Sequence, residues 1–318
     1  LIPLHVPLFS LCYITSQGYF YGSQYADRAY SVSACPDECD CPSSFPVAMY
    51  CNGRGLTTVP PIPSHIKYLY LQHNAITSLP DSALSNATNL VWLMLHFNQL
   101  TSESIGKKVN TIPSNLPLCL RDLRMDNNMI EKVSPADLEG MDNLTILYLH
   151  DNALSEVGSS LKGLNSLTLL DLSSNKLTKV PAPLPAYLHQ LYLEYNAIDS
   201  IPEGFLSLFS QLQYFRMSHN LLTNKGIPAN TFNVSGLVEL DLSFNKLERI
   251  PSVSTTLQYL YLQANQIKEF TVGSFCSVVD VTNFSRLLMV RLDGNELSLV
   301  DIPTDVSHCL RQVLDIEI

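Results

Sequence analysis

The chain has 318 residues, of which 46% are hydrophobic and only 15% are charged, so it can bury a large continuous core and is not a largely disordered chain. The formal net charge of −10 at pH 7 excludes general nucleic-acid binding, which requires a basic face to displace counterions from phosphates. No apolar run reaches the roughly 18 residues that a bilayer-spanning helix needs, so no membrane partner is expected.

The chain divides into five segments by composition. Residues 1–17 are apolar at their start and are interpreted as a signal-peptide remnant, and residues 18–34 form a flexible extension rich in tyrosine. Residues 35–64 hold four cysteines and are expected to cap the array of repeats over residues 65–275, while residues 276–318 form an extended last repeat and a C-terminal cap. Cysteines gathered at both ends of an array indicate an oxidising compartment, so we expect a secreted protein.

The pattern LxxLxLxxNxL recurs ten times at spacings of 20 to 30 residues, which is a signature of a solenoid. The copies begin at Ile66, Leu90, Leu120, Leu144, Leu167, Leu188, Leu212, Leu237, Leu257 and Leu287. In each copy the apolar positions point inward, and the asparagine, from Asn74 to Asn295, is suited to bond backbone groups in the bend after the strand.

These repeats predict an α/β leucine-rich-repeat solenoid. Each coil contributes one short strand, so a curved parallel β-sheet forms the concave face. Proline-containing joins such as VPAPLPAYL predict turns and polyproline segments on the convex face, and longer joins such as GFLSLFSQL predict short 3-10 or helical segments. Because no coil can bury its core alone, the array needs caps at its ends, and the cysteines predict disulfide-capped ends.

The cysteine signatures resemble a known family. The spacing C-x3-C-x-C-x9-C from Cys35 to Cys51 resembles class II of the small leucine-rich proteoglycans, and the 30-residue coil containing Cys276, followed by Cys309, resembles their extended "ear" repeat. The resemblance covers the chain from Cys35 to Ile318. Within the class, the tyrosine-rich leader and the segments EVGSSLKGL, VVDVTNFS and RLDGNE are most similar to one particular member.

The resemblance implies a fold stapled by three disulfides and a role in the extracellular matrix. The implied disulfides are Cys35–Cys41, Cys39–Cys51 and Cys276–Cys309. The implied function is a secreted matrix proteoglycan that binds fibrillar collagen, regulates fibril assembly and carries N-linked keratan sulfate; a growth factor of the transforming type is a further implied partner. The alternative is a soluble leucine-rich-repeat recognition protein that sequesters a growth factor or acts in innate immunity.

One spacing departs from the family pattern. The 30 residues between Leu90 and Leu120 stand where two coils are expected, so about one strand is missing near Val109. A true deletion and a gene-model error both explain this spacing. The join also leaves Cys119 without an obvious partner.

Four N-x-[ST] sequons, at Asn86, Asn143, Asn233 and Asn283, are candidate N-glycosylation sites. Three of them stand four residues before the first apolar position of their coil and one stands one residue before it, so we expect all four near the edge where the strands begin. Sulfation of Tyr25 is a weaker candidate, because Asp27 is its only acidic neighbour and unmodified disorder is the simpler interpretation.

The concave face is the expected partner site. Its predicted contact residues are Tyr70, Arg124, Tyr148, Asp171, Tyr192, Arg216, Asp241, Tyr261 and Arg291, with Glu296 near the end of the array. Tyrosine and arginine are frequent interface anchors, although a merely solvated sheet face is the alternative. Asp171 and Glu296 match family positions implicated in collagen contact, but Ser298 stands where the family has a basic residue. A homodimer through this face would compete with the partner.

No pattern in the sequence supports catalysis. GxSxG, HExxH, a glycine-rich phosphate loop and repeated-cysteine zinc spacing are all absent from the sequence, so we expect neither an enzyme nor a cofactor. The histidines before several repeat asparagines, His73, His96, His150 and His219, lack a carboxylate pattern typical of metal ligands. They are interpreted as polar residues on one rim, with no metal.

Overall fold

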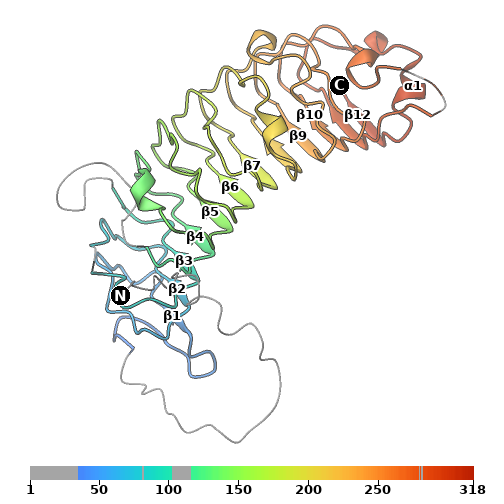
Figure 1. Ribbon diagram of the computed structural model, residues 1–318. Helices are drawn as coiled ribbons and strands as arrows, with labels where there is room; N and C mark the ends of the chain where they lie inside the picture. The colour runs from blue at the N-terminus through green and yellow to red at the C-terminus, as the bar shows by residue number, and fades with distance from the viewer. Residues whose placement is uncertain (1–34, 81, 102–115, 279, 281) are drawn as a thin grey trace, which may run out of the picture.

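The computed structural model describes residues 35–80, 82–101, 116–278, 280 and 282–318. Successive coils stack into one curved solenoid, with the strands side by side along its inner, concave side (Figure 1). The predicted leucine-rich-repeat solenoid with a parallel concave sheet is therefore confirmed. In the described residues no helix is long and apolar enough to cross a membrane.

The sheet has twelve strands in chain order rather than the ten that the pattern predicts. They are β1 (Ala48–Tyr50), β2 (Tyr68–Tyr70), β3 (Trp92–Met94), β4 (Asp122–Arg124), β5 (Ile146–Tyr148), β6 (Leu169–Asp171), β7 (Gln190–Tyr192), β8 (Tyr214–Arg216), β9 (Glu239–Asp241), β10 (Tyr259–Tyr261), β11 (Met289–Arg291) and β12 (Asp315–Glu317). The two additional strands, β1 and β12, come from the end caps, which lack the full pattern. They pair in parallel with β2 and β11 and so extend the sheet at both ends.

The repeat asparagines stitch neighbouring coils together. Asn220, for example, accepts a hydrogen bond at Oδ1 from the backbone N–H of Ile198 (2.9 Å), and its Nδ2 donates to the carbonyls of Leu193 (2.9 Å) and Met217 (3.2 Å). All ten repeat asparagines from Asn74 to Asn295 make bonds of this kind. The stack therefore satisfies the backbone groups that each bend removes from water.

The residue before each repeat asparagine, here called the rim position, has a left-handed backbone. Nine of these residues are not glycine, and their φ angles lie between 50° and 58°. They are His73, Phe97, Asn127, Asp151, Ser174, Tyr195, His219, Phe244 and Ala264, and Gly294 occupies the tenth rim position. Because the bend repeats with one geometry, the rim side chains form a single row along the edge of the concave face.

The convex side carries turns and short helical segments, as the joins predict. The 3-10 segments are η2 (Pro135–Asp137), η3 (Leu206–Leu208), η4 (Asn224–Gly226), η5 (Val272–Ser274) and η6 (Leu299–Asp301), and α1 (Val306–Cys309) is a single helical turn. Ser134 precedes η2 and forms a capping box with Asp137. The apolar residues from both sides merge into one continuous core that runs from Cys39 to Leu310.

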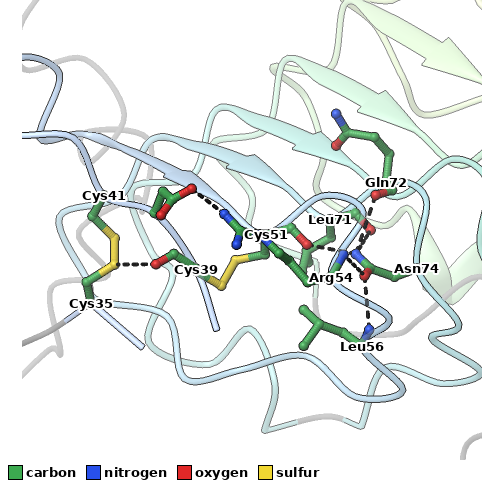
Figure 2. Close-up of a disulfide and its surroundings, with 10 residues drawn as sticks. Cys35, Cys39, Cys41, Cys51, Arg54, Leu56, Leu71, Gln72 and Asn74 are labelled. Carbon is green, nitrogen blue, oxygen red and sulfur yellow. Dashed lines mark hydrogen bonds and ion pairs between the residues drawn. A yellow bond between two sulfur atoms is a disulfide. The ribbon is translucent and has the colours of Figure 1, made fainter. Parts of the chain in front are cut away.

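Disulfides close both ends of the core. Cys35–Cys41 and Cys39–Cys51 hold the N-terminal cap against the first repeat, where Asn74 donates to the carbonyl of Cys51 (2.9 Å) (Figure 2). The third disulfide, Cys276–Cys309, joins the last long coil to α1. These three disulfides are the ones that the family resemblance implies.

The long coil between Leu90 and Leu120 does not interrupt the sheet. Strand β3 pairs directly with β4, and Leu93 lies opposite Leu123. Val109 itself lies outside the described residues. Cys119, for which the sequence offers no obvious partner, is disulfide-bonded, and no cysteine in the described ranges is free.

Candidate partner-binding face

In β2 and in β5 to β11 the middle residue is buried and the first and third residues are presented on the concave surface, because side chains alternate along a strand. The third residues form one continuous line, here called the central row. It contains the predicted residues Tyr70, Arg124, Tyr148, Asp171, Tyr192, Arg216, Asp241, Tyr261 and Arg291, all of them partly exposed. Met94 belongs to the same row but is only 6% exposed, so it offers little to a partner.

Aromatic rings gather at the N-terminal end of this face, in a cluster here called the aromatic patch: Phe45, Tyr50, Tyr68, Tyr70 and Trp92. Tyr50 stacks on Tyr70 at 4.6 Å between ring centroids, and Trp92 meets Tyr68 edge to face at 5.0 Å. Phe45 and Trp92 remain 42% and 40% exposed. Large aromatic side chains in such positions often anchor interfaces.

Of the aromatic patch, only Tyr70 is among the contact residues that the sequence predicts. Trp92 is the first residue of its strand, and the prediction concentrated on the third residues. Tyr50 and Phe45 belong to the N-terminal cap, where the repeat pattern is absent. The signal that identifies Trp92 was available, because the first and third residues of a strand face the same way.

The arginines of the central row are already paired with carboxylates of this chain. Arg124 donates from Nε and Nη2 to both oxygens of Asp122, at 3.1 and 3.0 Å. Arg216 donates to Glu239 at 2.6 Å across adjacent strands. These pairings neutralise much of the positive charge that the sequence offers to a partner.

The third central-row arginine follows the same rule. Arg291 donates to both oxygens of Asp293 at 3.1 Å and also contacts Glu317 on β12 at 2.6 Å. Two of the three guanidinium groups also lie over tyrosine rings: Arg124 is 4.9 Å from the ring centroid of Tyr148, and Arg216 is 5.1 Å from that of Tyr192. The face therefore builds arginine, tyrosine and carboxylate into one recurring unit.

Four carboxylates in the middle of the face have no lysine or arginine partner in the described part of the chain. They are Asp126, Asp171, Glu194 and Asp241, here called the acidic centre. Serines donate hydrogen bonds to three of them. The backbone N–H of Ser173 donates to Asp171 (2.9 Å) and its hydroxyl donates to Glu194 (2.9 Å). The backbone N–H and the hydroxyl of Ser243 both donate to Asp241. Burial raises the pKa of Glu194 above its ordinary value.

His150 bridges two members of the acidic centre. Its Nε2 lies 3.4 Å from Asp126 and its Nδ1 lies 3.2 Å from Asp171. The contact at Nδ1 is an ion pair rather than a well-aligned hydrogen bond. Burial opposes protonation, but the contact with Asp171 and the charges of Asp126 and Asp151 outweigh it, so the pKa of His150 is raised. The neighbouring His96 has a lowered pKa, because burial dominates there.

Partial burial also affects the acidity of the tyrosine hydroxyls in the central row. It raises the pKa values of Tyr70, Tyr148, Tyr192 and Tyr261. The phenols are therefore neutral at physiological pH and offer a hydroxyl that both donates and accepts. Tyr192 uses this hydroxyl to donate to Oε1 of Gln190 at 2.7 Å.

Glu296 lies apart from the other predicted contact residues. It follows the last repeat asparagine, Asn295, in the loop that leaves β11, and it is exposed. Its carboxylate is 3.7 Å from Lys268 of the preceding coil. The structure thus places Glu296 beyond the sheet and next to a basic group that the sequence pattern did not reveal.

The four sequon asparagines differ in exposure. Asn86, Asn233 and Asn283 are exposed, whereas Asn143 is half-buried and donates from Nδ2 to the carbonyl of Leu118 at 3.3 Å. Tyr25 and the two N-terminal segments, 1–17 and 18–34, lie outside the described residues. The described ranges contain no group of three His, Cys, Asp or Glu side chains that could hold a metal ion.

Comparison with known proteins identifies close relatives. Residues 119–177 match the leucine rich repeat family, and residues 34–63 match the leucine rich repeat N-terminal domain. Fibromodulin of Bos taurus is 52% identical over 301 residues, which cover 89% of this chain and 80% of that protein. Lumican of Gallus gallus is 44% identical, with coverage of 91% and 90%. The likeness to one class member that the leader and three segments predicted is a likeness to fibromodulin, and it is confirmed.

A solved structure shares the architecture. The leucine-rich-repeat protein FLRT2, in an octameric complex with Latrophilin 3 and Unc5D, is similar with a TM-score of 0.74 and 30% identity, covering 89% of this chain and 83% of the matched chain.

Proposed function

The chain belongs to the class II small leucine-rich proteoglycans, the family of fibromodulin and lumican, and on this premise we propose that its concave face binds fibrillar collagen and regulates fibril assembly. Members of this family are secreted proteins of the extracellular matrix and are not enzymes. The proposal therefore concerns the partner and the surface that contacts it.

The acidic centre is the observation that carries the proposal. Because the central-row arginines are paired internally, the groups left for a partner are carboxylates and tyrosines, which suit basic residues on a long partner. Twelve parallel strands about 4.8 Å apart give a face about 50 Å long, which fits a rod better than a small molecule.

Fibril-formation turbidity tests the proposal. Purified protein is expected to slow collagen fibril formation and reduce fibril diameter. The double variant Asp171→Ala/Asp241→Ala removes two carboxylates from the face without creating a new N-x-[ST] sequon, so it should lose most of this effect, whereas Asp142→Ala on the exposed loop before β5 should not. Unchanged kinetics and diameters with the wild-type protein would refute collagen binding.

Modification sites belong to the same proposal. We expect N-linked chains, including keratan sulfate, on Asn86, Asn143, Asn233 and Asn283. Three of the four are exposed, which favours extended chains there. Enzymatic removal of N-glycans should lower the mass of the secreted protein.

A soluble recognition protein remains the second candidate. The similar solenoid of FLRT2 is part of a complex with two other proteins, so this architecture suits protein ligands in general. A growth factor of the transforming type, or a second copy of this chain, would compete for the same face. Collagen and growth factor should then displace each other from the wild-type protein.

A further inference from the structure

Three aromatic rings form a ladder on the rim of the concave face. Tyr195, His219 and Phe244 occupy consecutive rim positions, and adjacent rings stack with centroids 4.0 Å apart and planes within 10° of parallel. Tyr195 is 56% exposed and Phe244 is 45% exposed. Bulky residues seldom adopt the left-handed backbone that this position requires, so the rings occupy a costly conformation without burying themselves in the core.

Small residues flank the ladder at both ends. Ser174 precedes Tyr195 in the row of rim positions, and Ala264 follows Phe244. Neither side chain is large enough to cover a ring, so each end of the ladder keeps one open ring face. The positions of these two small residues beside the open ring faces are here called the Ser174 slot and the Ala264 slot.

The two slots differ in charge. Beside the Ser174 slot, Asp151 occupies the preceding rim position with its side chain 49% exposed. The side chain of Glu194 extends to the coil that contains Ser174, since its carboxylate accepts a hydrogen bond from the Ser173 hydroxyl at 2.9 Å. Gly294 occupies the rim position after the Ala264 slot and contributes no side chain.

The groups around the Ser174 slot are of the same kinds that the concave face uses twice with its own arginines. Arg124 lies over Tyr148 while it bonds to Asp122, and Arg216 lies over Tyr192 while it bonds to Glu239. Around Ser174, a tyrosine stands on the next rim position, Asp151 stands on the preceding one, and Glu194 is bonded to the adjacent Ser173. Asp151 lies 3.9 Å from His150, and within the described residues no arginine of this chain pairs with either carboxylate.

We propose that the Ser174 slot is a binding site for an arginine side chain of a protein partner. The guanidinium plane stacks on the open face of Tyr195 and donates in its own plane to Glu194, while the negative charge of Asp151 attracts it from the preceding rim position. Arginine suits the slot better than lysine, because its planar group both stacks and bonds to carboxylates in a fixed geometry. Along the row of rim positions only the small side chain of Ser174 stands between Asp151 and Tyr195. With collagen as the partner, this site rests on the proposed function and names the residue type that is recognised.

Triple-helical peptides test the site. Two peptides of repeated Gly-Pro-Hyp triplets are compared, one with a central arginine and one with citrulline, which has the same shape but no charge. The full-length protein is expected to bind the arginine peptide about tenfold more tightly.

Filling the slot should remove this preference. Ser174→Tyr extends the ladder by one ring and should reduce the preference to below about twofold, and Asp151→Asn should weaken it without changing shape. Ala264→Tyr is the matched control, since it adds the same ring at the same backbone geometry at the other end, and it should keep the full preference. Thermal unfolding of each variant checks that the fold is intact.

The outcomes separate this inference from the proposed function. If the wild-type protein acts on collagen fibrils but does not distinguish arginine from citrulline, or if Ser174→Tyr behaves like Ala264→Tyr, the slot is not an arginine site. If the wild-type protein has no effect on fibrils, the collagen proposal fails. An arginine preference that persists in that case would assign the slot to a different basic protein.

Discussion

His150 is the residue whose charge state most directly affects the acidic centre. It contacts Asp126 through one ring nitrogen and Asp171 through the other. When it is protonated, it neutralises part of the charge that a basic partner needs. When it is neutral, both carboxylates lose their only described cationic neighbour within ion-pair distance.

The raised pKa of His150 predicts that the stability of the protein depends on pH. A histidine whose pKa is raised in the folded state stabilises that state fully below its unfolded pKa of about 6.5, and this contribution is lost as the pH rises through the folded value. The free energy of unfolding should therefore fall from pH 6 towards pH 8.5. Urea unfolding at each pH measures it, and His150→Gln should flatten this part of the profile; an unchanged slope would remove His150 as the cause.

Single residues also show what the sequence could not predict. The repeat pattern placed every central-row residue on the concave face, and the structure puts them there. It did not reveal that Arg216 is paired with Glu239, because these residues are 23 positions apart and meet only through the register of β8 and β9. The sequence therefore did not show that the arginines of the central row are neutralised within the chain.

At the scale of one coil, the repeat asparagine is the main polar support. Asn245 is 7% exposed, accepts from the backbone of Leu222 at 2.9 Å and donates to the carbonyls of Met217 and Leu242. No other side chain in the coil has both a donor and an acceptor in this position. Its loss leaves several backbone groups buried without partners.

Asn245→Ala should therefore destabilise the protein by about 3 kcal/mol, because each buried unsatisfied group costs about 1–3 kcal/mol. Chemical denaturation measures the change. Asn165 lies on the exposed surface, so Asn165→Ala should stay within about 0.5 kcal/mol of the wild type. Equal effects of the two substitutions would show that the bonds of Asn245 contribute nothing specific.

The strands themselves show where a repeat pattern is sufficient. Ten strands follow from ten matches to LxxLxLxxNxL, and each has only three residues, too few to be recognised from alternation alone. Strands β1 and β12 lack the full pattern and form because their neighbours offer an open edge in register. A three-residue strand that forms only because a neighbouring strand pairs with it cannot be predicted from its own residues.

At the scale of the whole molecule, the sequence has a net negative charge and so does the concave face. The net charge of −10 is consistent with an excess of unpaired carboxylates over unpaired arginines on the concave face. Binding that depends on such charges is screened by salt. The aromatic patch at the N-terminal end is insensitive to this screening.

Collagen binding should therefore weaken several-fold between about 50 mM and 500 mM NaCl, where the screening length falls from above to below about 10 Å. Surface plasmon resonance across this range measures the dependence. Asp171→Ala/Asp241→Ala should show a shallower dependence on salt, while Trp92→Ala should lower affinity at every salt concentration. Binding that does not change with salt would argue that the aromatic patch alone carries the contact.

The uniform register of the twelve strands has a geometric consequence. Two strand steps cover about 9.6 Å, and three residues of a polyproline-type chain cover about 9.3 Å. A collagen-like rod lying along the sheet would thus meet every second strand once per triplet, with a mismatch of only about 0.3 Å each time. Across the whole sheet the drift stays below about 2 Å, less than one residue. The repeat of two strands and the repeat of one triplet therefore have nearly the same length. Successive triplets of such a rod would face successive pairs of residues along the central row.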